Sequence, residues 1–184
     1  MKKFLFILLT GLLVGCSTNT ESNIEVIEPT SLVLETGKEN EVIRFETEFG
    51  DYESYSGDIL VNTSDTLGFI CENRYSTLDC GGSYTDKFSV VISNNVITIY
   101  NTSYNTTADN GYTSRYEIST DSSFLSILNN TLSEYDWVST YTEIRKFISG
   151  HSAVTMSKGM SDTSSKDEDG NYFWEIEFNK LLGN

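Results

Sequence analysis

The residues that could do acid–base chemistry in this chain are its carboxylates. Glu175 and Glu177 alternate with apolar side chains in the segment 172–179, and the alternation predicts a strand. Two carboxylates on one face of a strand could act as nucleophile and general acid–base in sugar hydrolysis. A second acidic group lies earlier, at Asp51, Glu53 and Asp58. We interpret Glu175 and Glu177 as exposed carboxylates opposite an apolar face, and keep as an alternative a hydrolase that uses paired carboxylates of either group.

The segment around these two glutamates resembles a strand of one glycoside-hydrolase family of jelly-roll fold. The resemblance implies paired catalytic carboxylates on that strand. That family has an aspartate where this chain has Glu177 and a second acid where it has Lys180. Because both positions differ, we name no catalytic residue.

The single histidine, His151, follows a glycine in a predicted turn. No G-x-S-x-G motif accompanies it, and one histidine leaves no ordinary zinc site. Clustered carboxylates at 167–169 precede Gly170, as in calcium loops, but an EF-hand register puts Ile176 where a bidentate glutamate is required. We therefore predict no metal and no cofactor, leaving open only a weak calcium site that includes Asp162.

Aromatic residues give the strongest indication of binding. Flat rings in or beside loops and strand ends can stack on sugars or pack at a protein interface. The alternative is that most of them complete a core that has few leucines. The candidate ligand-binding residues are Tyr52, Tyr55, Tyr84, Tyr104, Tyr112 and Trp137.

The N-terminal residues have the pattern of an export signal. Lys2 and Lys3 precede an apolar run, 4–14, that is too short to cross a bilayer of about 30 Å as a stable helix. The following Leu13-Val14-Gly15-Cys16 resembles the lipobox of bacterial lipoproteins. The resemblance implies that Cys16 carries acyl chains that anchor the protein, and that Ser17 directs it to the outer membrane or cell surface. The alternative is an ordinary secretory signal.

Length and charge limit the remaining possibilities. We expect a signal at 1–15, a lipidated tether at 16–30 and a single β domain at 31–184. The formal net charge is −15, and loss of the signal would remove two lysines and no acids. Such a surface repels phosphates, so we expect no nucleic-acid partner and contact with the membrane through the lipid alone.

Export also determines how the remaining cysteines are interpreted. Cys71 and Cys80 enclose a short segment in a chain expected in an oxidising compartment, which predicts a loop disulfide. Closing so small a loop would contribute about 3 kcal/mol in the chain-entropy model. The alternative, a redox pair or half a metal site, lacks the usual CxxC spacing.

Period-two alternation, β-branched residues and turn residues dominate from residue 32 onward. They predict strands at 32–35, 42–48, 59–61, 66–71, 88–92, 96–100, 112–119, 137–148, 153–158 and 172–179. Asn94 and Asn95 predict a tight hairpin, because asparagine tolerates positive φ. Asp121 or Ser122 is expected to cap one short helix near 121–130.

These elements predict an all-β antiparallel meander that forms a barrel or a two-sheet sandwich. Trp137 and the segment that follows it resemble lipocalin-like domains, although the Gly-x-Trp signature of that group is absent. The resemblance implies a fold and no ligand. We expect a lipid-anchored extracytoplasmic protein that binds a glycan, an apolar small molecule or an envelope protein. The alternatives are an envelope hydrolase and a purely structural surface lipoprotein.

Overall fold

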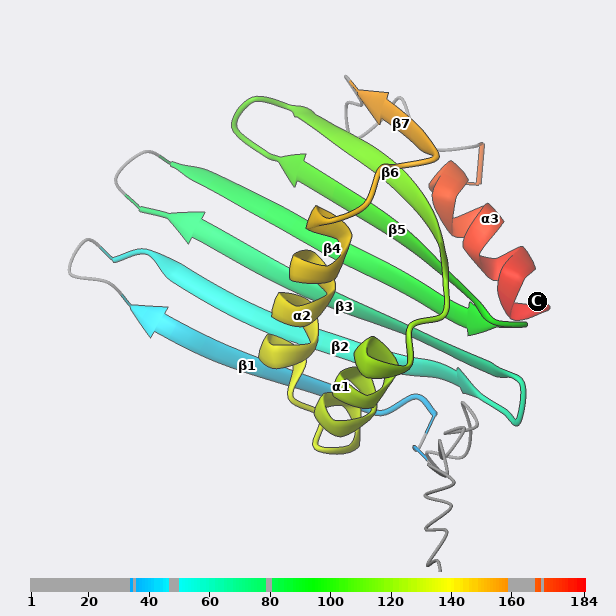
Figure 1. Ribbon diagram of the computed structural model, residues 1–184. Coiled ribbons are helices and arrows are strands. Elements are labelled where there is room, and N and C mark those ends of the chain that lie inside the picture. The colour runs from blue at the N-terminus through cyan, green and yellow to red at the C-terminus, as the bar shows by residue number, and fades with distance from the viewer. Residues whose placement is uncertain (1–33, 35, 47–49, 79–80, 159–167, 170) are drawn as a thin grey trace, which may run out of the picture.

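The computed structural model of the chain describes residues 34, 36–46, 50–78, 81–158, 168–169 and 171–184. Within them, seven strands form one antiparallel sheet in sequential order (Figure 1). The strands are β1 (Glu39–Glu46), β2 (Tyr52–Asn62), β3 (Thr66–Thr77), β4 (Gly82–Ser93), β5 (Val96–Asn105), β6 (Asn110–Ser119) and β7 (Thr155–Lys158). The predicted antiparallel meander is confirmed, and the sheet is open, with β1 and β7 as its edges.

Helices cover both faces of this sheet. The described residues form α1 (Ser122–Ser133) and α2 (Trp137–Ser149) on one face and α3 (Phe173–Leu182) on the other (Figure 1). The helix predicted near 121–130 is α1. Asp121 caps it by accepting hydrogen bonds from the backbone N–H groups of Ser123 and Phe124.

The strand predicted at 137–148 is wrong, because this segment is helix α2. Asp136 caps the helix, accepting hydrogen bonds from the backbone N–H of Ser139 at 3.1 Å and from its hydroxyl at 2.6 Å. The buried side chains recur every three or four positions, which is the period of one helix face. They are Trp137, Thr140, Tyr141, Ile144 and Ile148.

The strand predicted at 172–179 is also wrong, because the segment forms α3. Trp174 and Phe178, four residues apart, are both buried on the same helix face. Glu175 accepts a hydrogen bond at 2.9 Å from the backbone N–H of Tyr172, so its carboxylate satisfies a backbone donor at the start of the helix. The alternation of residue types was therefore a helical pattern sampled over too short a window.

The predicted hairpin is confirmed. Ser93 pairs with Val96, and Asn94 and Asn95 have φ of 51° and 61°, the left-handed values of a type I′ turn. Several other predicted strands are shorter than the observed ones: those at 59–61, 66–71, 88–92 and 96–100 are parts of β2, β3, β4 and β5. The strand predicted at 32–35 lies largely outside the described residues.

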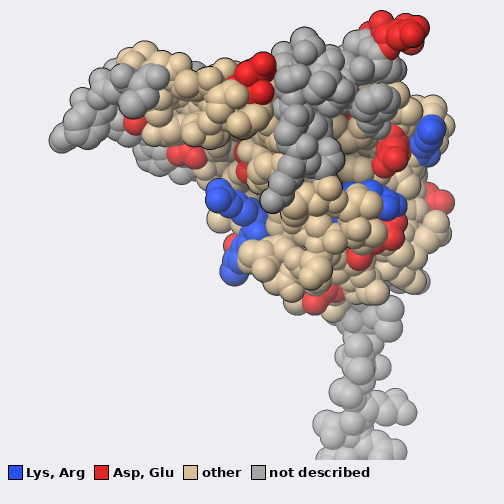
Figure 2. Space-filling view, turned by 90° about the horizontal axis from the view of Figure 1, so that it is seen from above, with Lys and Arg blue, Asp and Glu red and all other residues tan. Residues whose placement is uncertain are grey.

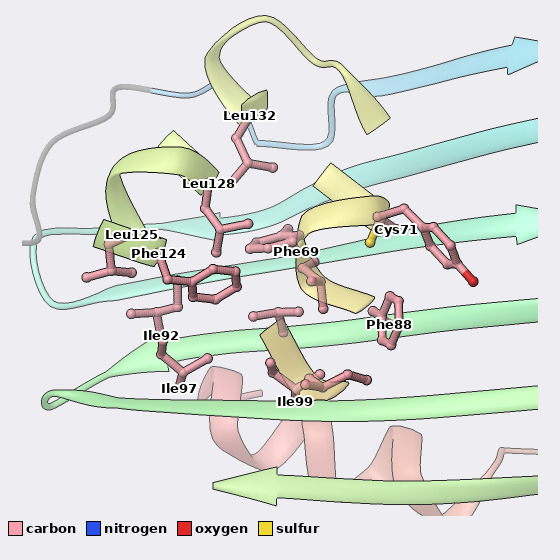
Figure 3. Close-up of a cluster of buried hydrophobic side chains, with 14 of the residues drawn as sticks. Phe69, Cys71, Phe88, Ile92, Ile97, Ile99, Phe124, Leu125, Leu128 and Leu132 are labelled. Atoms are coloured by element: carbon pink, nitrogen blue, oxygen red, sulfur yellow. The ribbon is translucent and has the colours of Figure 1, made fainter. Parts of the chain in front are cut away.

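The main core lies between the sheet and the helices α1 and α2 (Figure 3). Figure 3 shows Phe124, Leu128 and Leu132 of α1 directed toward the strands, with Ile92 and Ile97 at one end of the cluster and Phe88 at the other. Trp137, fully buried at the start of α2, packs against β2 at Gly57. A Cβ atom on Gly57 would overlap the Trp137 ring, so this contact requires glycine.

A smaller core lies under α3 on the opposite face. Trp174 and Phe178 pack there against Val91 and Tyr100, and the rings of Tyr100 and Phe178 meet edge to face. Together the two cores cover the same half of the sheet from both sides. Among the described helices, none is both long and apolar enough to cross a membrane.

Candidate functional site

The sheet face that carries α1 and α2 changes from apolar to polar along its strands. Under the helices, one row of paired residues across β2 to β5 is Ile59, Phe69, Val90 and Ile99. Four residues further along each strand, the paired row across β2 to β6 is Tyr55, Asn73, Asp86, Ser103 and Tyr112. The next row outward is Glu53, Tyr75, Tyr84 and Asn105. We call the two polar rows, the one that contains Asp86 and the one that contains Tyr84, the polar shelf.

The polar shelf lies on strand ends that extend past α2. Figure 1 shows these ends at the left of the sheet, and Figure 2 shows them projecting from the thicker part of the molecule. Tyr84 is 46% exposed and Tyr112 is 37% exposed, whereas Asn73 is only 9% exposed. The shelf therefore offers aromatic rings at its surface and buried polar groups beside the helix.

Glu53 is held in place by two donors. The Tyr55 hydroxyl donates to Glu53 Oε1 at 2.6 Å, and Asn73 Nδ2 donates to the same oxygen at 2.7 Å. The neighbouring Tyr75 hydroxyl donates to Asp51 Oδ2 at 2.8 Å, and its ring centroid lies 6.5 Å from that of Tyr84. These bonds orient the tyrosine rings at the outer end of the shelf.

Asp86 lies at the boundary between the shelf and α2. The buried Tyr141 of α2 donates its hydroxyl hydrogen to Asp86 Oδ2, and its ring meets the Tyr55 ring edge to face with centroids 5.5 Å apart. Burial raises the pKa of Asp86, an effect that the Tyr141 hydroxyl and the charge of Arg145 partly offset. Burial, reinforced by the negative charge of Asp86, raises the pKa of Tyr141. Tyr141 therefore remains a neutral phenol that donates its hydroxyl hydrogen to Asp86.

Two acceptor oxygens, one of Asp86 itself and one of a neighbouring residue, receive no hydrogen bond. Asp86 Oδ1 and Asn101 Oδ1 are buried and make no hydrogen bond within the described structure. Asn101, 7% exposed, lies opposite Phe88, and Asp86 lies opposite Ser103, so the two side chains are diagonal neighbours on one face. A buried acceptor without a donor costs about 1–3 kcal/mol, so a ligand that brings a donor would recover that free energy.

The structure separates the six predicted ligand-binding residues into three groups. Tyr55, Tyr84 and Tyr112 belong to the polar shelf. Tyr52 and Tyr104 are on the opposite sheet face, where the Tyr104 hydroxyl donates to Asp109 Oδ1 at 2.6 Å. Trp137 is fully buried in the core, so its prediction as a binding residue is wrong.

Sequence reasoning missed the residues that complete the site. The missed residues are Asn73, Tyr75, Asp86, Asn101, Tyr141 and Arg145. Asp86 could have been found by extending the alternation of the predicted strand 88–92 backward by two residues, since it shares a face with Phe88. Tyr141 and Arg145 were hidden by the strand prediction, because only a helix puts residues four apart on one face.

The carboxylates considered for hydrolysis are dispersed. Glu53 belongs to the polar shelf, whereas Asp58 is on the opposite face of the same strand. Glu175 caps α3, and Glu177 accepts a hydrogen bond at 3.2 Å from the Tyr100 hydroxyl. The two glutamates do not share one face of a strand, because their segment is a helix.

Cys71, one partner of the predicted disulfide, is a buried free thiol in the described structure. Its predicted partner, Cys80, lies outside the described residues, so the pairing stays a prediction.

The remaining predictions concern the histidine, metal binding, and the segments that carry the predicted lipid anchor and acidic loop. His151 follows α2, and its ring Nδ1 lies 2.9 Å from the Phe147 carbonyl oxygen. Within the described ranges, no group of three or more His, Cys, Asp or Glu side chains could hold a metal ion. The predicted signal, tether and Cys16, together with Asp162 and Gly170 of the acidic loop, lie outside the described residues.

Comparison of the chain with protein-family models, with curated proteins and with solved structures finds no match in any of the three.

Proposed function

We propose that this chain is a lipid-anchored extracytoplasmic protein that binds a glycan on the polar shelf. The observation that carries the proposal is the combination of exposed tyrosine rings with buried polar groups: Tyr84 is 46% exposed, and Asp86 Oδ1 and Asn101 Oδ1 have no donor. Sugar rings present flat apolar faces and many hydroxyl donors. Aromatic rings beside acceptor oxygens match both features.

The anchor is the second part of the proposal. The lipobox-like sequence ending at Cys16 supports it, and the expected place of action is the bacterial cell envelope, at the outer membrane or cell surface. The acidic net charge of −15 keeps the domain away from anionic head groups. The shelf would therefore face the medium at the end of a tether.

The other candidate ligands fit the described structure less well. An apolar small molecule needs an apolar cavity, but the space between the sheet and α1 and α2 is filled by a close-packed cluster that includes Phe69, Leu128 and Ile144. A hydrolase needs two carboxylates across one scissile bond, and the glutamates at 175 and 177 serve structural bonds in α3. Glycan binding requires neither feature.

Binding of a panel of oligosaccharides to the full chain in detergent micelles tests the proposal. Removing the exposed ring by Tyr84→Ala should weaken binding of the sugar that binds best by about tenfold. The matched control is Tyr52→Ala, because Tyr52 is 42% exposed on the opposite sheet face. Equal losses of saccharide affinity in Tyr84→Ala and Tyr52→Ala, or no saturable binding of any saccharide to the full chain, would contradict the proposal.

A further inference from the structure

The two acceptors at the inner edge of the polar shelf indicate the chemical class of the ligand. Asp86 Oδ1 and Asn101 Oδ1 are both buried acceptors that no described residue satisfies. They come from neighbouring strands and are diagonal neighbours on one face. The group that fits must donate at least two hydrogen bonds.

The site also carries negative charge. Asp86 is a carboxylate when ionised, and Glu53 is another on the same face, two strands away. The positive charge of Arg145 acts on Asp86, but the two described side chains form no ion pair within 4.0 Å. A donor that is positively charged would therefore be favoured over a neutral one.

An exposed aromatic ring near Asp86 favours a cation as well. Tyr84, 46% exposed, lies two residues before Asp86 on the same face of β4. The π face of such a ring attracts ammonium groups. An ammonium group has three donors and no acceptor, so it could satisfy both oxygens without leaving an acceptor of its own unpaired.

Building on the proposed glycan-binding function, we propose that the polar shelf recognises sugars with a free amino group. The protonated amine binds between Asp86 Oδ1 and Asn101 Oδ1, and the sugar ring packs on Tyr84. An N-acetylated sugar binds more weakly, because its amide has one N–H donor, no positive charge and an added acetyl group. The net charge of −15 also attracts a cationic glycan at long range.

A comparison of two matched probes tests this inference. Calorimetric titration of the full chain in micelles uses the tetramer of glucosamine and the tetramer of N-acetylglucosamine, at a pH where the amines are protonated. We expect the amine form to bind at least about tenfold more tightly, which corresponds to about 1.4 kcal/mol. Asp86→Asn should reduce the preference to about twofold, while thermal unfolding checks that the isosteric variant folds.

A pair of surface variants gives an independent test, in which the informative variant is expected to strengthen binding. Arg145 is exposed and its positive charge opposes an ammonium near Asp86, so Arg145→Gln should tighten binding of the amine tetramer about threefold. Lys146→Gln is the matched control, since the Lys146 side chain is 75% exposed and pairs with Glu143 at 3.6 Å. It should leave the affinity within about 1.5-fold at physiological salt.

The outcomes separate this inference from the proposed function. Equal or tighter binding of the N-acetylated tetramer, still weakened by Tyr84→Ala, would overturn the amine preference and leave glycan binding in place. Binding of neither tetramer, nor of any other saccharide, would overturn both. An amine preference that Asp86→Asn leaves unchanged would place the cation elsewhere and would also overturn the inference.

Discussion

Asp86 is the residue on which the candidate site depends most. It accepts the Tyr141 hydroxyl through one oxygen and keeps the other buried without a donor. Such an arrangement costs stability in the free protein, because a partly dehydrated charge is poorly compensated. That cost is consistent with a group kept for binding.

This cost gives a prediction about pH. Because burial raises the pKa of Asp86 above its usual 3.8, the folded chain holds that proton more tightly than the unfolded chain. The contribution of Asp86 to the free energy of unfolding therefore decreases as pH rises from about 3.8 through the raised pKa, and is constant above it. Asp86→Asn removes this dependence. The free energy of unfolding of the variant, relative to wild type, should therefore increase as pH rises through this range.

Urea unfolding at a series of pH values measures this difference, and contributions from the other titrating groups cancel in it. A difference between Asp86→Asn and wild type that does not change with pH would contradict the prediction. So would a variant that loses stability relative to wild type as pH rises.

The thiol of Cys71 gives a second prediction. Burial raises its pKa well above the usual value, and the charges of Asp86 and Glu72 act in the same direction. We expect Cys71 to resist alkylation by iodoacetamide in the folded chain and to react on unfolding. Mass spectrometry of the alkylated peptides measures both rates. Equal rates, or a peptide cross-linked from Cys71 to Cys80, would show that the thiol is not buried and free.

The junction between α2 and the sheet depends on a glycine. Trp137 packs where Gly57 has no side chain, so Gly57→Ala forces the ring or the strand to move. We expect the free energy of unfolding to fall by about 1–3 kcal/mol, which is typical of overpacking. Because the same helix carries Tyr141, this variant should also weaken ligand binding.

Chemical unfolding of Gly57→Ala measures this effect, and Gly150→Ala is its control. A Cβ on Gly150 would meet only the Phe147 carbonyl oxygen at 3.6 Å, an ordinary contact, and its φ of −87° suits alanine. The control should stay within about 0.5 kcal/mol of wild type. Similar stabilities for both alanine variants would show that Trp137 does not pack as described.

Among the secondary-structure elements, those determined by local sequence were predicted correctly, and those determined by packing of one helix face were not. The hairpin at Asn94-Asn95 was predicted correctly, because turn chemistry and flanking alternation are both local. The segment that became α2 is rich in β-branched and aromatic residues, which favour strands, but the Asp136 cap and burial of one face determine a helix. The alternation of glutamates with apolar residues around Ile176 fits both periods over so few positions.

The site was less predictable than the fold. Three tyrosines of the polar shelf were named from their positions in or beside predicted loops and strand ends, but the shelf requires residues from five strands to lie in register. Pairings such as Asn73 with Asp86 follow from strand order and register, which no local pattern in the sequence specifies.

For the whole molecule, the lipid anchor is the prediction that determines where the shelf acts. Cys16→Ser should abolish metabolic labelling of the protein with radioactive palmitate in a bacterial host, because the acylated thiol is lost. Cys71→Ser is the control and should retain labelling. Labelling that persists in Cys16→Ser would refute the lipobox interpretation and leave a secreted form.

The most direct test of the central claim, glycan binding on the polar shelf, is an NMR titration of the isotope-labelled full chain in micelles with the glucosamine tetramer. We predict saturable shifts in the backbone amide signals of Asn73, Asp86 and Asn101, which lie on the shelf and its inner edge. The amides of Trp174 and Phe178 in α3, on the opposite face, should not shift. Shifts concentrated on α3, or no saturable shift on the shelf with any saccharide, would contradict the claim.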